Sequence, residues 1–242
     1  ITLRRLQRRN RGIMNFSVHP FKHWVIDDFF SPKRAKRLSE EFLPLSDKWH
    51  HYSNYFEEKF ANKDLDTFPS VYKEVFNHLM GNEFMNWLMM TTGELDLVPD
   101  TSLYGGGLHT HSRGGKLNVH LDYSLHPENG MERKYNLIVY LSEGWKPEWG
   151  GALEFWEGDE TAPSKKAVSV DCLFNRAVLF DTSTNSSWHG FSDPITCPEG
   201  HQRNSIALYY LAPPSNSANP SRKRAKFAPV SGKEAQIMER YS

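Results

Sequence analysis

The sequence predicts a mainly β fold, a β-sandwich or jelly roll, with helices on its N-terminal side. Helical periodicity is confined to the first hundred residues. After Gly93 the sequence changes to short β-rich runs separated by clusters of Gly, Pro, Asn and Asp. Roughly eight such runs with no helical pattern between them are typical of a sandwich or jelly roll. The 242 residues are 38% hydrophobic and 13% aromatic, which suits one sizeable core and excludes a wholly disordered chain.

Three helices are expected in the first hundred residues. The first follows Ser31-Pro32, because Ser is a favoured N-cap and Pro is favoured at the first helical position, and it ends before Pro44. The second spans about 69–80. The third spans about 82–92 and ends at Gly93. Residues 46–68 have mixed polarity and stay unassigned.

The β-rich part has a predicted strand in each apolar run. These strands are expected near residues 102–109, 116–122, 135–142, 151–156, 167–171, 177–181, 187–191 and 203–211. The sequence thus divides into residues 1–100, a helical region packed on the core, residues 101–214, the β domain, and residues 215–242, a basic C-terminal tail. Within the tail we expect a linker at 215–221 and a short helix at 232–241.

Charge and cysteine content exclude several classes of protein. Lys and Arg number 29, as do Asp and Glu, so the formal net charge is zero, although residues 1–12 and 215–242 are basic. Overall neutrality argues against a dedicated nucleic-acid binder. No apolar run is long enough to cross a membrane, and the first residues lack the apolar core of a signal peptide. Two cysteines make no disulfide framework, which indicates a reducing, cytoplasmic setting.

A candidate metal site lies in the predicted strands. His120 and Asp122 are two residues apart, so on a strand their side chains project from the same face. A further histidine from another strand would complete a set of two imidazoles and one carboxylate. That set suits Fe(II) with open positions for other ligands. His189, on a predicted strand near the end of the β-rich region, is the candidate for the third ligand.

A candidate anion clamp begins the last predicted strand. Arg203 and Ser205 share one face there. An arginine holds a carboxylate through two parallel, charge-assisted hydrogen bonds, and a serine hydroxyl adds another. A metal on one side and a carboxylate clamp on the other would fit a dicarboxylate co-substrate.

Taken together, these residues resemble a known family. The pattern His120-x-Asp122, then His189, then Arg203-x-Ser205 resembles the Fe(II)- and 2-oxoglutarate-dependent dioxygenase superfamily. Tyr140-Leu141-Ser142, followed by Trp145 and by Gly150-Gly151-Ala152-Leu153, resembles the prolyl-hydroxylase-like branch. Ser142 stands where that branch usually has Asn. The resemblance covers residues 104–212.

The resemblance implies a fold, a set of site residues and a reaction. The core would be a double-stranded β-helix, that is, a jelly roll. Iron would bind His120, Asp122 and His189, while Arg203 and Tyr140 would hold the distal carboxylate of 2-oxoglutarate. With O2, such an enzyme hydroxylates an unactivated C–H bond, here that of a prolyl residue in a peptide or protein, and releases succinate and CO2.

Strand alternation adds two expectations around these residues. If Tyr140 points inward, Asn136 and Ile138 do too, and Leu137 and Val139 face an outer packing layer. By the same rule Asn118 lies on the face of His120, where it would orient a ligand or contact substrate.

Other functions stay open at this stage. The substrate could be a free amino acid or small metabolite, with the loop 123–134 as lid or clamp. His109-x-His111 resembles the opening of a cupin metal site, which would imply a zinc or manganese hydrolase or isomerase, but no acid follows it. A non-enzymatic jelly-roll binding module is the third alternative. It would have to explain an inward-facing Arg203, because a buried unpaired guanidinium is costly.

Overall fold

The computed structural model describes residues 13–229, 231–232 and 236. The basic residues 1–12 and most of the predicted helix at 232–241 lie outside this part of the chain.

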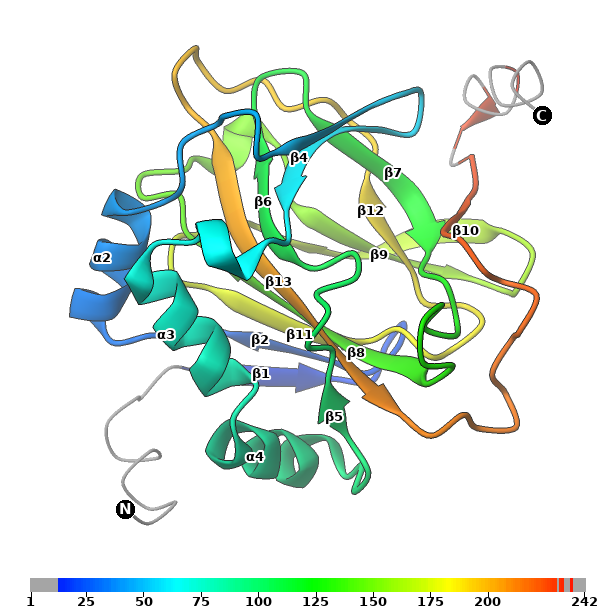
Figure 1. Cartoon of the computed structure of the whole chain (residues 1–242). Helices are drawn as coiled ribbons and strands as arrows, with labels where there is room; N and C mark the ends of the chain where they lie inside the picture. The colour runs from blue at the N-terminus through cyan, green and yellow to red at the C-terminus, as the bar shows by residue number, and fades with distance from the viewer. Residues whose placement is uncertain (1–12, 230, 233–235, 237–242) are drawn as a thin grey trace.

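Three helices lie where the periodicity predicts them. They are α2 (Pro32–Glu40), α3 (Ser70–Leu79) and α4 (Asn82–Thr92). Gly93 ends α4 in the left-handed conformation, with φ of 80°, as expected for a C-terminal glycine. The helices lie together on one outer side of the sheet (Figure 1). None of the described helices is long and apolar enough to cross a membrane.

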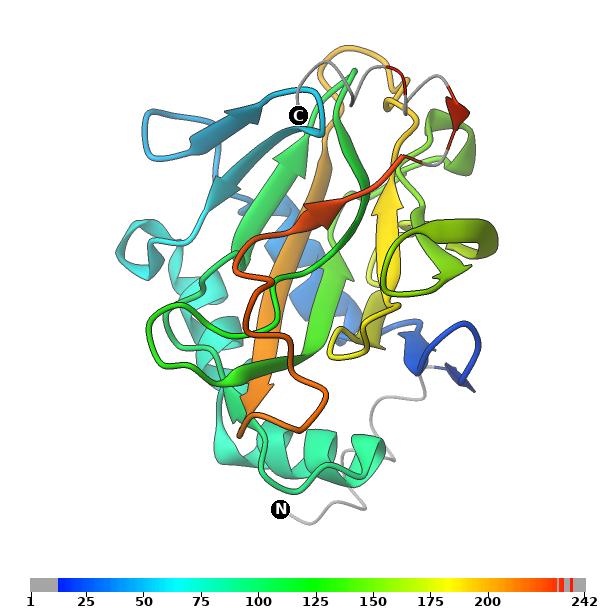
Figure 2. The same cartoon turned by 90° about the vertical axis from the view of Figure 1, so that its right-hand side faces the viewer.

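The rest of the described chain is a curled antiparallel sheet, a jelly roll. Its strands are β1 (Met14–Ser17), β2 (His23–Ile26), β3 (His50–Ser53), β4 (Glu57–Asn62), β5 (Val98–Pro99), β6 (Gly107–His111), β7 (Lys116–Leu121), β8 (Glu132–Tyr140), β9 (Leu153–Gly158), β10 (Pro163–Val170), β11 (Ala177–Asp181), β12 (Trp188–Phe191), β13 (Arg203–Ala212) and β14 (Lys226–Phe227). The main order is β1-β2-β11-β8-β13-β6-β4-β7-β12-β9-β10, and Figure 2 shows the strands wrapping around the interior. Two 3₁₀ turns, Leu65–Thr67 and Pro147–Trp149, complete the described elements. The eight predicted strands correspond to β6–β13.

The first hundred residues contribute strands as well as helices, which the sequence pattern did not predict. Strand β2 pairs with β11, and β4 lies between β6 and β7. Both are short, and five of the six residues of β4 are only half-buried, so neither shows a clear apolar alternation. Strand β14, in the predicted basic tail, was missed for the same reason.

Strand β8 separates the structural core from the interior of the jelly roll. Leu137 and Val139 join the core cluster that contains the buried helix residues. On the other face, Asn136 and Ile138 line a cavity of about 180 Å³, and Tyr140 is buried in a second cluster. The predicted alternation along this strand is confirmed.

Candidate metal centre

Three side chains meet inside the cavity. His120 on β7 lies directly opposite His189 on the adjacent strand β12, and Asp122 follows β7 by one residue. One ligand atom from each of the three lies within 4.8 Å of the other two. Within the described residues this is the only cluster of its kind, and all three side chains are buried.

Backbone carbonyls orient both imidazoles. Nδ1 of His120 donates to the carbonyl of Asn118, and Nδ1 of His189 donates to that of Ser187, each at 2.8 Å. This leaves both Nε2 atoms as acceptors facing Asp122, at 3.8 Å from His120 and 3.7 Å from His189. A hydrogen bond on one ring nitrogen is what fixes the tautomer of a metal-binding histidine.

The charge states suit a divalent cation. Burial lowers the pKa of His120 to about 3 and lowers that of His189 as well, so both rings are neutral at neutral pH. Burial by itself raises the pKa of Asp122, but the Arg133 cation and the hydrogen bond from the Tyr209 hydroxyl act in the opposite direction, and that pKa lies below its usual value. Two neutral imidazoles and one carboxylate with lone pairs directed at one another form a donor set that fits Fe(II).

Arg203 lies buried in the same cavity, at the start of β13. Its Nε donates to the carbonyl of Gly151 at 2.8 Å, and Nη2 donates to the Tyr140 hydroxyl at 3.3 Å. Burial raises the pKa of Tyr140 to about 12, so the hydroxyl keeps its proton. Within the described residues no carboxylate lies within ion-pair distance of Arg203. A buried guanidinium in that position fits the carboxylate of a ligand.

The remaining predicted residues divide between the cavity and its surroundings. Ser205 lines the cavity beside Arg203 and pairs in register with Tyr140, which lies behind the guanidinium. Asn118 is buried on β7 but is not among the lining residues, and the contact with His120 runs through its backbone carbonyl.

His109 and His111 line the cavity on β6 but lie outside the metal cluster. They pair in register with Ser205 and Arg203, and the His111 ring lies 5.1 Å from that of Phe191. They therefore border the pocket and do not form a cupin-type metal site with His120.

Arg133 is a site residue that sequence reasoning missed. It is buried between the rings of Tyr123 and Tyr209, with Cζ at 3.5 and 3.4 Å from their centroids, and Nη1 lies 3.3 Å from Oδ1 of Asp122. It also donates to the Tyr123 hydroxyl. The sequence pattern placed Arg133 in the loop 123–134, whereas it lies on β8. Tyr209 could have been found, because it shares the face of Arg203 and Ser205 on β13.

Two chain segments outside the predicted core also line the cavity. Strand β4 supplies Glu57 and Lys59, which form an ion pair at 3.0 Å. The segment 222–228, which we call the C-terminal strap, supplies Ala225 and Phe227. No local pattern marked either segment, because their position depends on pairing with strands far away in the sequence.

Comparison with known proteins agrees with this arrangement. The sequence model described as the 2OG-Fe(II) oxygenase superfamily matches residues 106–211. Prolyl 3-hydroxylase OGFOD1 of Mus musculus is 26% identical over 198 residues, which are 81% of this chain and 34% of that protein. The chain therefore spans about one third of the length of this curated relative.

Two solved structures share the fold. One is a prolyl-4-hydroxylase of Pseudomonas putida, with a TM-score of 0.53, 13% identity, and coverage of 80% of this chain and 93% of the other. The second is a prolyl hydroxylase of Trichoplax adhaerens in complex with a peptide fragment, with a TM-score of 0.54, 16% identity, and coverage of 78% and 83%. In its fold, its matched segment and its buried cluster of His120, Asp122 and His189, the chain is similar to the 2OG-Fe(II) oxygenase superfamily and, within it, to prolyl hydroxylases.

Proposed function

We propose that this chain is an Fe(II)- and 2-oxoglutarate-dependent dioxygenase that hydroxylates a prolyl residue in a peptide or protein. The observation that carries the proposal is one cavity that holds both the cluster of two histidines and one aspartate and a buried arginine with no protein carboxylate beside it among the described residues. The prolyl hydroxylases among its relatives support the choice of substrate.

Each residue has a separate task in this proposal. His120, Asp122 and His189 would hold the ferrous ion, with their donor atoms already directed at one another. Arg203, supported by Tyr140 and Ser205, would bind the distal carboxylate of 2-oxoglutarate and so fix the direction in which the diacid enters. When bound, iron and 2-oxoglutarate supply the activation of O2, and succinate and CO2 are the co-products. Leu153 and Phe191 in the cavity lining help to keep bulk water from the reacting atoms.

We also propose that the chain works in the cytoplasm on a peptide or protein partner, without binding membrane or nucleic acid. Cys172 and Cys197 are both free and buried, which suits a reducing compartment.

The test is succinate release against a panel of prolyl peptides and small metabolites, with and without Fe(II) and 2-oxoglutarate. We expect turnover with peptides that depends on both. Turnover with metabolites alone would identify the alternative substrate class. Absence of both metal and 2-oxoglutarate binding would favour a non-enzymatic binding module.

A matched pair of variants links the activity to the cluster. His189→Ala should abolish Mn(II) binding and succinate release while leaving the circular dichroism spectrum unchanged. His201→Ala, at an exposed histidine outside the cavity, should change neither. Wild-type turnover in His189→Ala would exclude this metal site.

A further inference from the structure

The C-terminal strap runs back across the jelly roll to β7, the strand that carries His120 (Figure 2). Its strand β14 is antiparallel to β7, with Lys226 opposite Leu121 and Phe227 opposite His120. The amide of Ala228 donates to the carbonyl of Val119 at 3.1 Å. The strap is therefore an added strand beside the proposed metal site.

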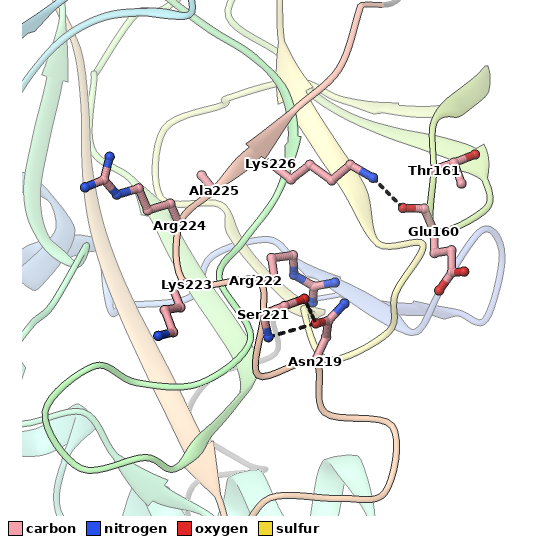
Figure 3. A pocket seen from close by; sticks show the side chains of 9 residues that line it. All are labelled: Glu160, Thr161, Asn219, Ser221, Arg222, Lys223, Arg224, Ala225 and Lys226. Carbon is pink, nitrogen blue, oxygen red and sulfur yellow. Dashed lines mark hydrogen bonds between the residues drawn. The ribbon is translucent and has the colours of Figure 1, made fainter. Parts of the chain in front are cut away.

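The strap has apolar residues beside the cavity and exposed cationic residues. Ala225 and Phe227 line the cavity. Lys223, Arg224 and Lys226 are exposed and, together with Ala225, line a separate outer cleft that includes Glu160 (Figure 3). The side chains that the strap contributes to the cavity are therefore apolar, while its cations lie outside the cavity.

A buried arginine fixes the beginning of the strap. Nε of Arg222 donates to the backbone carbonyl of Asp122 at 2.7 Å, and Nη1 donates to Oδ1 of Asn185 at 2.8 Å. The Arg222 carbonyl accepts from the amide of Ser124 at 3.0 Å. The strap is thus bonded directly to the backbone at a proposed iron ligand.

Phe227 lies against that ligand set on the side of His120. Its ring centroid is 5.2 Å from that of His120, and it is stacked on Phe56 at 4.8 Å with an interplanar angle of 18°. Arg203, by contrast, packs on Tyr140 and Phe191. The cavity therefore has a cationic wall suited to the diacid and an aromatic wall beside His120 that no part of the proposed function uses.

We propose that Phe227 is a specificity-determining residue: it forms the wall on which an apolar group of the substrate, such as a pyrrolidine ring, packs beside the metal. This inference rests on the proposed function, because it assigns the substrate side of the same site. The rigid, flat face of an aromatic ring offers large apolar contact at low entropic cost. A charged or strongly hydrated group at the same place would lose its water without gaining a partner.

The test compares Phe227→Ala with Lys223→Ala, which removes an exposed side chain from the same strap. The first measurement needs no substrate: bound Mn(II) is removed with a chelator, and the rate is followed together with the equilibrium Kd. We expect Phe227→Ala to release Mn(II) several-fold faster with an unchanged Kd, because a wall over the metal controls access and not affinity. Lys223→Ala should match the wild type.

The second measurement uses a peptide that the wild type hydroxylates. We expect Phe227→Ala to raise the KM for peptide at least tenfold and to weaken the preference for prolyl over other residues. Lys223→Ala should keep the wild-type KM and the wild-type preference. Phe227→Leu keeps an apolar side chain of similar reach, so it should recover most of the peptide affinity and prolyl preference. It also controls for misfolding of the alanine variant.

Three results would overturn the proposal. Phe227→Ala and Lys223→Ala could behave alike in both measurements. Phe227→Ala could abolish Mn(II) binding, which would make Phe227 a support for His120. It could also speed turnover of every peptide, which would make the strap an inhibitory plug. A wild-type protein that binds no metal would instead contradict the proposed function.

Discussion

Arg203 and Arg133 are both buried against the same cavity, yet within the described residues only Arg133 has a carboxylate partner. Two buried cations of this kind are tolerated only if each meets an anion or a set of acceptors. Both pack against two aromatic rings, but Arg133 also has the Asp122 carboxylate, whereas Arg203 donates to one carbonyl and one hydroxyl. The difference between their partners predicts different outcomes when each is replaced.

Replacing Arg203 should affect the co-substrate. Arg203→Ala removes hydrogen bonds to a carboxylate worth about 1.5–3 kcal/mol each, so the KM for 2-oxoglutarate should rise roughly tenfold to a hundredfold. Mn(II) affinity should stay unchanged, because Arg203 touches none of the three ligands. Measuring succinate release at increasing concentrations of 2-oxoglutarate gives this KM. An unchanged KM would mean that Arg203 is not the residue that binds the co-substrate carboxylate.

Replacing Arg133 should affect the metal-free protein most. Arg133→Met leaves Asp122 as a buried carboxylate without its cation, which should cost about 3–5 kcal/mol of unfolding free energy. Saturating Mn(II) should recover part of that loss, because the metal then neutralises the same carboxylate. Urea denaturation with and without Mn(II) measures both values. An equal loss in the two conditions would show that Arg133 acts through its packing between Tyr123 and Tyr209.

At the scale of elements, the site depends on how closely β12 approaches β7. Gly190 lies between His189 and Phe191, where the pairing of the two strands shifts register. Its φ is 154°, and a Cβ there would meet the carbonyl oxygens of Leu117 and Asn118 at 2.7 Å. A side chain at this position would have to push apart the two strands that carry His120 and His189.

Gly190→Ala should therefore weaken metal binding as well as stability. We expect a loss of about 1–3 kcal/mol in unfolding free energy and at least a tenfold higher Kd for Mn(II). Gly93→Ala is the matched control, since Gly93 has a φ of 80° and a methyl group added there would have no neighbouring atom within 4 Å. It should cost about 1–2 kcal/mol through the left-handed backbone alone and leave the Kd unchanged. Equal Kd values for both variants and the wild type would contradict this argument.

Elements whose signals are local could be predicted from the sequence. Helices α2, α3 and α4 follow apolar periodicity with Pro or Gly at their boundaries, and β6–β13 follow β-rich runs between turn residues. The candidate ligands could be chosen because spacing of two residues on a strand fixes a common face. Strands β4 and β14 could not be predicted, since short strands of mixed polarity are defined by partners distant in the sequence. The position of Arg133 in the site could not be predicted for a related reason, because only the folded sheet brings it to Asp122.

At the scale of the whole molecule, the buried histidines should make the metal-free protein sensitive to acid. Burial lowers the pKa of His111, His120 and His189 in the folded state, while in the unfolded chain each would titrate near its ordinary value of about 6.5. The unfolded state then binds more protons below that pH, so stability is full above about pH 6.5 and falls as the pH decreases toward about 3. Asp122, with its lowered pKa, adds no loss until the pH drops below about 4.

The expected loss between pH 7 and pH 5 is up to about 2 kcal/mol for each of these histidines. Urea denaturation of the metal-free protein at the two pH values measures it, and His189→Gln should show a smaller difference because it removes one of the titrating groups. Equal stability of the wild type at pH 7 and pH 5 would contradict the prediction.

The position of β4 has a practical consequence for expressing truncated fragments of the chain. In the sheet, β13 and β6 carry the arginine side of the site, β7 and β12 carry the imidazoles, and β4 is the strand hydrogen-bonded to both β6 and β7. A fragment limited to residues 101–214 would lack this bridging strand and would also leave β11 without β2. Such a truncation would expose unpaired sheet edges, which promote aggregation. The strands that carry the arginine and those that carry the imidazoles would also no longer be held in register. The minimal unit worth expressing therefore starts before β2, well upstream of residues 106–211, which match the 2OG-Fe(II) oxygenase model.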